Sequence, residues 1–213
     1  MSEGFIRAHT QLSHAPLVPE IKLHLATEMT PIWQASEAWL AEHDMEPPFW
    51  AFAWPGGQAL ARYLFDNPIL IKAGMKILDF AAGCGIAGIA CALLGADVEA
   101  AEIDRLAVAA IALNAAENKV FLTCLLADLV GAPGRWDMII CGDVCYEAPM
   151  TEHILPWLRD CARAGCIVWI ADPGRAYRPA TGLAEIHRCI VPTTLELEDS
   201  GEREVVIYRL TGV

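Results

Sequence analysis

The sequence predicts an α/β fold: a seven-stranded, mostly parallel sheet with helices on both faces and a C-terminal antiparallel hairpin. After Gly74, short apolar runs alternate with longer runs of helical periodicity, which is typical of successive β-α-β units. A glycine-rich segment joins the first apolar run to the first helical run. Near the C-terminus, two runs predicted as strands flank a turn that contains Gly201.

The chain divides by composition into an N-terminal appendage, residues 1–48, and a main domain, residues 49–213. In the appendage, prolines flank a possible short strand, IKLHL (21–25), and a helical run over 32–42. The main domain opens with apolar residues at helical spacing over 57–65, and Asn67-Pro68 ends that helix.

The elements that follow are assigned from hydrophobic periodicity. Strands of parallel type are expected at 76–80, 97–101, 121–125, 136–142 and 166–171. Helices are expected at 86–94, 105–117, 150–164 and near 181–188. The terminal hairpin is expected to pair TTLELED (193–199) with REVVIYRL (203–210).

Charge and cysteine spacing exclude several classes of function. The chain has 213 residues, with 15 Lys and Arg against 27 Asp and Glu, a net charge of −12. A surface this acidic does not attract a phosphate backbone, so no nucleic-acid partner is expected. The eight cysteines lack zinc-ligand spacing, so no metal site is expected. The N-terminus carries no targeting signal and no membrane span is predicted, which indicates a cytoplasmic protein.

The glycine-rich segment predicts a site for an adenosine compound. Gly83, Gly85 and Gly88 match G-x-G-x-x-G between a strand and a helix, and Glu102 lies at the end of the next strand. Glycines let a ligand approach the backbone, and the acid can accept hydrogen bonds from ribose hydroxyls. A dinucleotide such as NAD and an adenosyl sulfonium both satisfy this pattern.

Asp79 distinguishes these two ligands. Its carboxylate is expected at the end of the first strand, where a dinucleotide would place its pyrophosphate. An acid there repels phosphate and suits the ammonium and sulfonium of S-adenosylmethionine. The alternative is that Asp79 only caps the helix or forms a local ion pair.

Three segments resemble the cofactor motifs of the Rossmann-like, seven-strand (class I) methyltransferases. They are LDFAAGCG (78–85), AAEID (100–104) and ADL (127–129), although Ala81 stands where the family usually has its first glycine. The resemblance implies S-adenosylmethionine as cofactor. It also implies a role for each matching residue: Asp79, Gly83 and Gly85 at the methionine end, Glu102 at the ribose, and Asp128 with Leu129 beside the adenine.

Four further segments resemble the lysine methyltransferases that modify the electron transfer flavoprotein β-subunit. They are LVPEIKLHL (17–25), PPFWAFAWPGGQALARYLFDNP (47–68), GDVCYE (142–147) and ADPGR (171–175). The resemblance implies methyl transfer to lysine side chains of that flavoprotein subunit. Ribosomal protein L11 methyltransferases are a nearby group. An NAD-dependent oxidoreductase, the alternative from another class, would need a substrate domain that this chain does not obviously supply.

Asp143 and Tyr146 are the candidate catalytic residues. They follow an apolar strand at the carboxyl edge of the sheet, where parallel α/β folds bind ligands. A lysine amine must lose its proton before it attacks a methyl group, which costs roughly 4–5 kcal/mol at pH 7. A nearby sulfonium and exclusion of water lower that cost, so the two side chains are expected to position the amine. The alternative is that Asp143 caps the next element and Tyr146 packs.

Two residues of the resembling segments carry more specific expectations. Trp54, the tryptophan of WPGG, is expected either to cover the cofactor or the lysine channel, or to pack in the core. Arg175 of ADPGR is expected to pair with an acidic side chain of this chain rather than with one on the partner.

Overall fold

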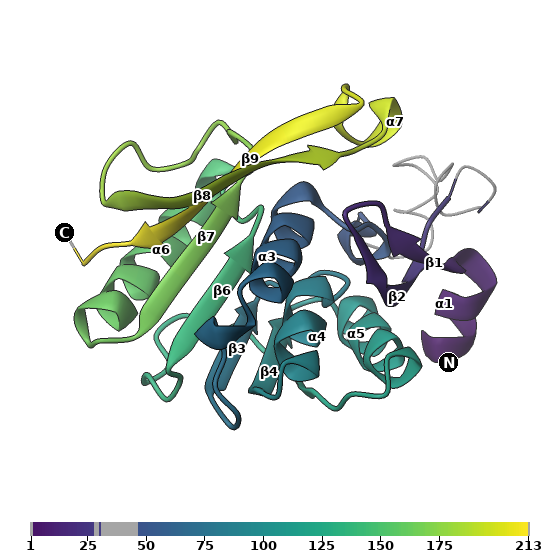
Figure 1. Ribbon diagram of the computed structural model, residues 1–213, viewed down its shortest axis with the longest axis horizontal. Helices are drawn as coiled ribbons and strands as arrows, with labels where there is room; N and C mark the ends of the chain where they lie inside the picture. The colour runs from purple at the N-terminus through teal and green to yellow at the C-terminus, as the bar shows by residue number, and fades with distance from the viewer. Residues whose placement is uncertain (1, 28–29, 31–46, 213) are drawn as a thin grey trace.

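The computed structural model describes residues 2–27, 30 and 47–212. Its centre is a seven-stranded sheet in the order β5-β4-β3-β6-β7-β9-β8 (Figure 1). The parallel strands are β3 (Lys76–Phe80), β4 (Asp97–Glu102), β5 (Thr123–Leu126), β6 (Met138–Gly142) and β7 (Ile167–Asp172). The antiparallel hairpin consists of β8 (Leu183–Pro192) and β9 (Glu202–Leu210), and β9 also pairs with β7. The predicted fold class and strand number are confirmed.

Helices cover both faces of the sheet (Figure 1). On one face lie α3 (Pro55–Asp66), α4 (Ile86–Leu93) and α5 (Arg105–Glu117), and on the other lies α6 (Ala148–Arg163). Successive side chains of a strand point to opposite faces. Accordingly Ile77 packs in the cluster with α3 and α4, whereas Leu78 packs in the cluster with α6. These three central helices and α6 agree with the predicted ranges to within about two residues.

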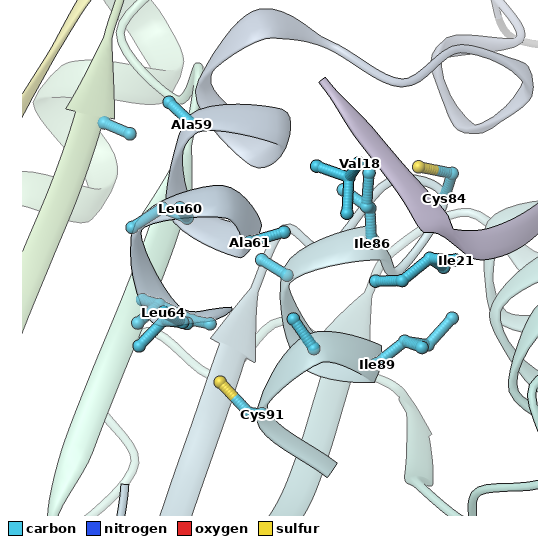
Figure 2. Close-up of a cluster of buried hydrophobic side chains, with 14 of the residues drawn as sticks. Val18, Ile21, Ala59, Leu60, Ala61, Leu64, Cys84, Ile86, Ile89 and Cys91 are labelled. Atoms are coloured by element: carbon cyan, nitrogen blue, oxygen red, sulfur yellow. The ribbon is translucent and has the colours of Figure 1, made fainter. Parts of the chain in front are cut away.

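The N-terminal segment packs onto the same core. It contains α1 (Ser2–His9) and a hairpin of β1 (Gln11–Ala15) with β2 (Val18–Leu25). Val18 and Ile21 of this hairpin are fully buried against side chains of α3 and α4 (Figure 2). The strand predicted at 21–25 is confirmed as part of β2, whereas α1 and β1 were not predicted. The helical run predicted over 32–42 lies outside the described residues.

Two short 3-10 turns, Phe49–Ala51 and Pro68–Leu70, flank α3. Pro55 occupies the first position of α3, where a missing N–H costs no helical hydrogen bond. Asp104 begins α5, because its side chain accepts a hydrogen bond from the Leu106 amide at 2.7 Å.

Two predictions in the C-terminal third are wrong. The segment near 181–188, predicted as a helix, belongs to strand β8, which pairs with β9 from Leu183 opposite Leu210 to Pro192 opposite Glu202. The segment 193–199, predicted as a strand, contains the short helix α7 (Leu195–Glu198). Pairing along nine residues of β9 overrides the helical pattern of 181–188, since strand formation depends on neighbours distant in the chain. The terminal hairpin exists, but its first strand lies earlier in the sequence.

Candidate active site

The glycine loop between β3 and α4 adopts a conformation that only small residues tolerate well. Gly83 and Gly85 have φ angles of +56° and +80°, and Ala81 has +53°. A side chain at Gly85 would press against Ile111, whereas space above Gly83 is open. The Gly83 amide donates to Glu102 Oε1 at 2.7 Å. The loop therefore turns its backbone toward the end of β4.

Asp79 lies beneath this loop and is almost completely buried. Its Oδ2 accepts a hydrogen bond from the Gly88 amide at 2.8 Å, so the carboxyl caps the first turn of α4. A Cβ at Gly88 would lie 2.8 Å from the same oxygen, which explains the third glycine of the motif. Burial raises the pKa of Asp79 to about 8. Asp79 both caps the helix and lines a pocket.

The two carboxylates at the end of β4 and just after it have different partners. Glu102 is half-buried, accepts from Gly83 and also accepts from the Ile103 amide at 3.1 Å. Burial raises its pKa. Asp104 instead caps α5. Glu102 is thus the acid in contact with the glycine loop.

The loop after β5 presents Asp128 to solvent and turns Leu129 inward. Asp128 Oδ1 accepts from the Val130 amide at 2.9 Å, and its Oδ2 lies 2.7 Å from His153 Nε2. Leu129 packs in the hydrophobic cluster with α6. Sequence reasoning missed His153, which lies 25 residues away from Asp128 and carries no motif signal.

Asp143 joins three segments at the carboxyl edge. It has a left-handed φ of +58° and is 6% exposed. Its Oδ2 accepts from the Gly56 amide near the start of α3. Its Oδ1 accepts from Arg175 Nε at 3.0 Å and Nη2 at 2.7 Å, so the expected internal pair of Arg175 is confirmed. Burial raises the pKa of Asp143 to about 6, although Arg175 opposes this shift.

Trp54 and Tyr146 flank the ring of Phe49, which was not among the predicted site residues. The Phe49 ring centroid lies 5.9 Å from Trp54 and 5.6 Å from Tyr146. Trp54 Nε1 donates to the Phe49 carbonyl at 2.8 Å, which fixes the indole. Tyr146 is 41% exposed. Its hydroxyl-bearing ring therefore lies at the surface near the start of α3.

A narrow pocket lies between these elements. Its lining residues come from the start of α3, the glycine loop and the end of β6: Phe52, Trp54, Gly57, Asp79, Ala81, Ala82, Gly83, Cys84, Ile86, Ala87 and Gly142. Within the described part of the chain, Asp79 is the charged residue that lines it, and no Lys or Arg does. A positive group beside Asp79 favours its ionised form, so this lining fits a cationic ligand, and it offers a diphosphate no cation to pair with.

The structure brings most of the predicted site residues to one edge of the sheet. Asp79, Gly83 and Trp54 line the pocket. Glu102 accepts a hydrogen bond from the glycine loop, and Asp143 accepts one from the Gly56 amide. The side chain of Leu129 instead packs in the core.

Residues 2–27, 30 and 47–212 show neither a membrane-spanning helix nor a cluster of metal-ligating side chains. In these ranges no helix combines the length and apolarity needed to cross a membrane. The same ranges contain no cluster of three or more His, Cys, Asp or Glu residues suited to a metal ion.

The fold is the Rossmann-like fold found in methyltransferases of known structure. The magnesium protoporphyrin IX methyltransferase of Synechocystis, solved with bound SAM, superposes with a TM-score of 0.55 at 20% identity, covering 84% of this chain and 88% of that one. The profile of the family described as lysine methyltransferase matches residues 32–178. This chain belongs to that lysine methyltransferase family.

Among its relatives are electron transfer flavoprotein beta subunit lysine methyltransferases. The Xenopus laevis protein is 41% identical over 178 residues, covering 81% of this chain and 70% of the relative. The Danio rerio protein is 35% identical over 217 residues, covering 97% of this chain and 82% of the relative.

Proposed function

We propose that this lysine methyltransferase modifies lysine side chains of the electron transfer flavoprotein β-subunit in the cytoplasm. The methyl donor is S-adenosylmethionine, whose sulfonium supplies a methyl group that a neutral amine can attack. The relatives' substrate supports the protein target, and the acidic surface, with a net charge of −12, suits a protein that presents basic side chains. We propose no nucleic-acid partner and no metal ion for this reaction.

The observation that carries the proposal is the pocket whose lining charge is Asp79. The main chain of Gly83 and Gly85 lets the methionine end of the donor approach, and Asp79 stabilises its positive charge. Glu102, at the other side of the loop, accepts from the ribose hydroxyls. The loop after β5 holds Asp128 and the main chain of Leu129 beside the adenine.

The acceptor lysine enters between Trp54 and Tyr146. Phe49 completes an aromatic wall there, and aromatic faces attract an ammonium group. Asp143 is held by Gly56 and Arg175, so its role is to fix the loop that carries Tyr146 rather than to take a proton. The donor's positive sulfonium and loss of water around the bound side chain favour the neutral amine, and water at the mouth removes the proton.

Mass spectrometry of purified flavoprotein tests the substrate. After incubation with the enzyme and S-adenosylmethionine, we expect lysines of its β-subunit to gain the mass of one, two or three methyl groups. Ribosomal protein L11, incubated in parallel, is expected to gain none. An unmodified β-subunit together with a modified L11 would transfer the assignment to the alternative substrate.

Binding of the donor is expected to be pH-dependent because of Asp79. Its pKa of about 8 lies above the usual 3.8, so the unliganded fold retains a proton that the unfolded chain loses. The stability contributed by this proton therefore falls as pH rises from about 4 through 8. A cationic ligand favours the carboxylate, so binding releases a proton and strengthens with pH.

Calorimetry with S-adenosylhomocysteine, which lacks the sulfonium but keeps the ammonium group expected beside Asp79, measures this linkage. We expect affinity to rise about tenfold between pH 6 and pH 7.5, with proton release. Asp79→Asn, which keeps an acceptor for the Gly88 amide, should remove the pH dependence. Equal affinity of the wild type at both pH values would contradict contact between Asp79 and the ligand.

A further inference from the structure

A row of four alternating charges runs from the active-site edge into the C-terminal hairpin. Asp143 binds Arg175, Arg175 binds Glu198, and Glu198 binds Arg203. The side chains of Asp143 and Glu198 are 7% and 1% exposed, whereas those of Arg175 and Arg203 are 20% and 38% exposed. The buried acids thus alternate with partly exposed cations.

Glu198 belongs to α7, the short helix between β8 and β9 (Figure 1). Its two carboxylate oxygens accept from both terminal nitrogens of Arg175, with Nη1 at 3.1 Å from Oε2. Arg203 Nε donates to Oε2 at 3.0 Å, and Arg203 Nη2 donates to the Glu198 main-chain carbonyl at 2.7 Å. Side chain and backbone of Glu198 are therefore both fixed to β9.

This arrangement restricts the Arg175 guanidinium from two sides. Asp143 takes Nε and Nη2, while Glu198 takes Nη1 and Nη2, so the planar fork has one orientation that satisfies both acids. The guanidinium carbon also lies 5.8 Å from the Trp54 ring centroid. Its orientation consequently affects both the Asp143 loop and the start of α3.

We infer that Glu198 is a positioning residue for methyl transfer: through Arg175 it fixes Asp143, and through Asp143 it fixes the Gly56 amide and the Tyr146 loop. The inference rests on the proposed roles of Trp54 and Tyr146. By this role α7 contributes to methyl transfer although it carries none of the proposed reacting groups. Without Glu198, Arg175 keeps one carboxylate and gains alternative orientations, and Asp143 moves with it.

Hydrogen exchange and kinetics of Glu198→Gln test this inference. Glutamine keeps the shape of the side chain but loses its charge. We expect amide exchange in peptides covering residues 54–58 and 143–147 to accelerate about tenfold, with unchanged exchange in β3 and α6. We expect kcat to fall about tenfold while affinity for S-adenosylhomocysteine stays within about twofold. Glu198→Asp keeps the charge on a shorter side chain and should recover part of both effects.

Glu204→Gln is the matched control, because Glu204 lies on the same hairpin and pairs with exposed Arg188. It should behave as the wild type in both measurements. If amide exchange in these two peptides is no faster in Glu198→Gln than in Glu204→Gln, the inference is wrong. Faster exchange over the whole sheet would also overturn it, because it would indicate a general loss of stability. The exchange measurement needs no acceptor protein, so an unmodified flavoprotein would refute the proposed substrate without affecting this test.

Discussion

Gly56→Ala is expected to lower the rate of methyl transfer about 100-fold, because about 1 Å of misplacement near a reacting centre has effects of that size. A Cβ at Gly56 would lie 2.6 Å from the Ala171 carbonyl oxygen and 2.8 Å from the Asp143 amide nitrogen. Both neighbours are backbone, so the start of α3 must withdraw from the sheet edge. Withdrawal breaks the hydrogen bond from Gly56 to Asp143 and displaces Trp54 from the pocket.

Initial rates and urea unfolding of Gly56→Ala test this expectation. Overpacking at this contact should also reduce the free energy of unfolding by about 1–3 kcal/mol. Gly134→Ala is the control, since a Cβ there meets nothing within 4 Å. A Gly56→Ala enzyme that works within about twofold of the wild-type rate would show that close packing of α3 on the edge is not required.

Asp143→Ala is expected to abolish methyl transfer while S-adenosylhomocysteine still binds. The substitution removes the acceptor of the buried Gly56 amide and one of the two acids that hold Arg175. We expect the free energy of unfolding to fall by about 2–4 kcal/mol because these buried groups lose a partner. The loss is no larger because Arg175 still pairs with Glu198 and retains some contact with solvent. Asp143 does not line the pocket, so the affinity for S-adenosylhomocysteine should change only a few-fold.

Calorimetry, initial rates and urea unfolding separate these effects in the Asp143→Ala protein. Asp160→Ala is the control, since it breaks the exposed ion pair with Arg163. Asp143→Asn keeps the shape of the side chain and measures the contribution of its charge. Equal loss of S-adenosylhomocysteine binding and methyl transfer in Asp143→Ala would place this residue in the cofactor site instead.

Patterns that are local in the sequence were predictable. The glycine loop, the helix after it and the acid on the next strand each depend on neighbouring residues and on the known path of a β-α-β unit. The short apolar strands β3, β6 and β7 are buried on both faces, so their composition alone identifies them. Together they predict a ligand-binding loop at the carboxyl end of β3.

An internal acidic partner for Arg175 was expected, but which residues pair across distant parts of the chain was not predictable. The edge strand β8 has a mixed pattern of burial and takes its conformation from pairing with β9, so it resembled a helix in sequence. Asp143 and Arg175 are 32 residues apart, and Arg175 and Glu198 are 23 apart. Their shared orientation follows from the order of β6, β7 and β9 in the sheet, which places three chain segments at one edge.

A crystal structure of the protein with S-adenosylhomocysteine shows directly where the cofactor lies. We expect ribose hydroxyls within hydrogen-bond distance of Glu102, the amino group beside Asp79, and the sulfur directed toward the opening between Trp54 and Tyr146. A nucleoside bound with its ribose away from Glu102, or its sulfur directed away from Trp54 and Tyr146, would contradict this expectation.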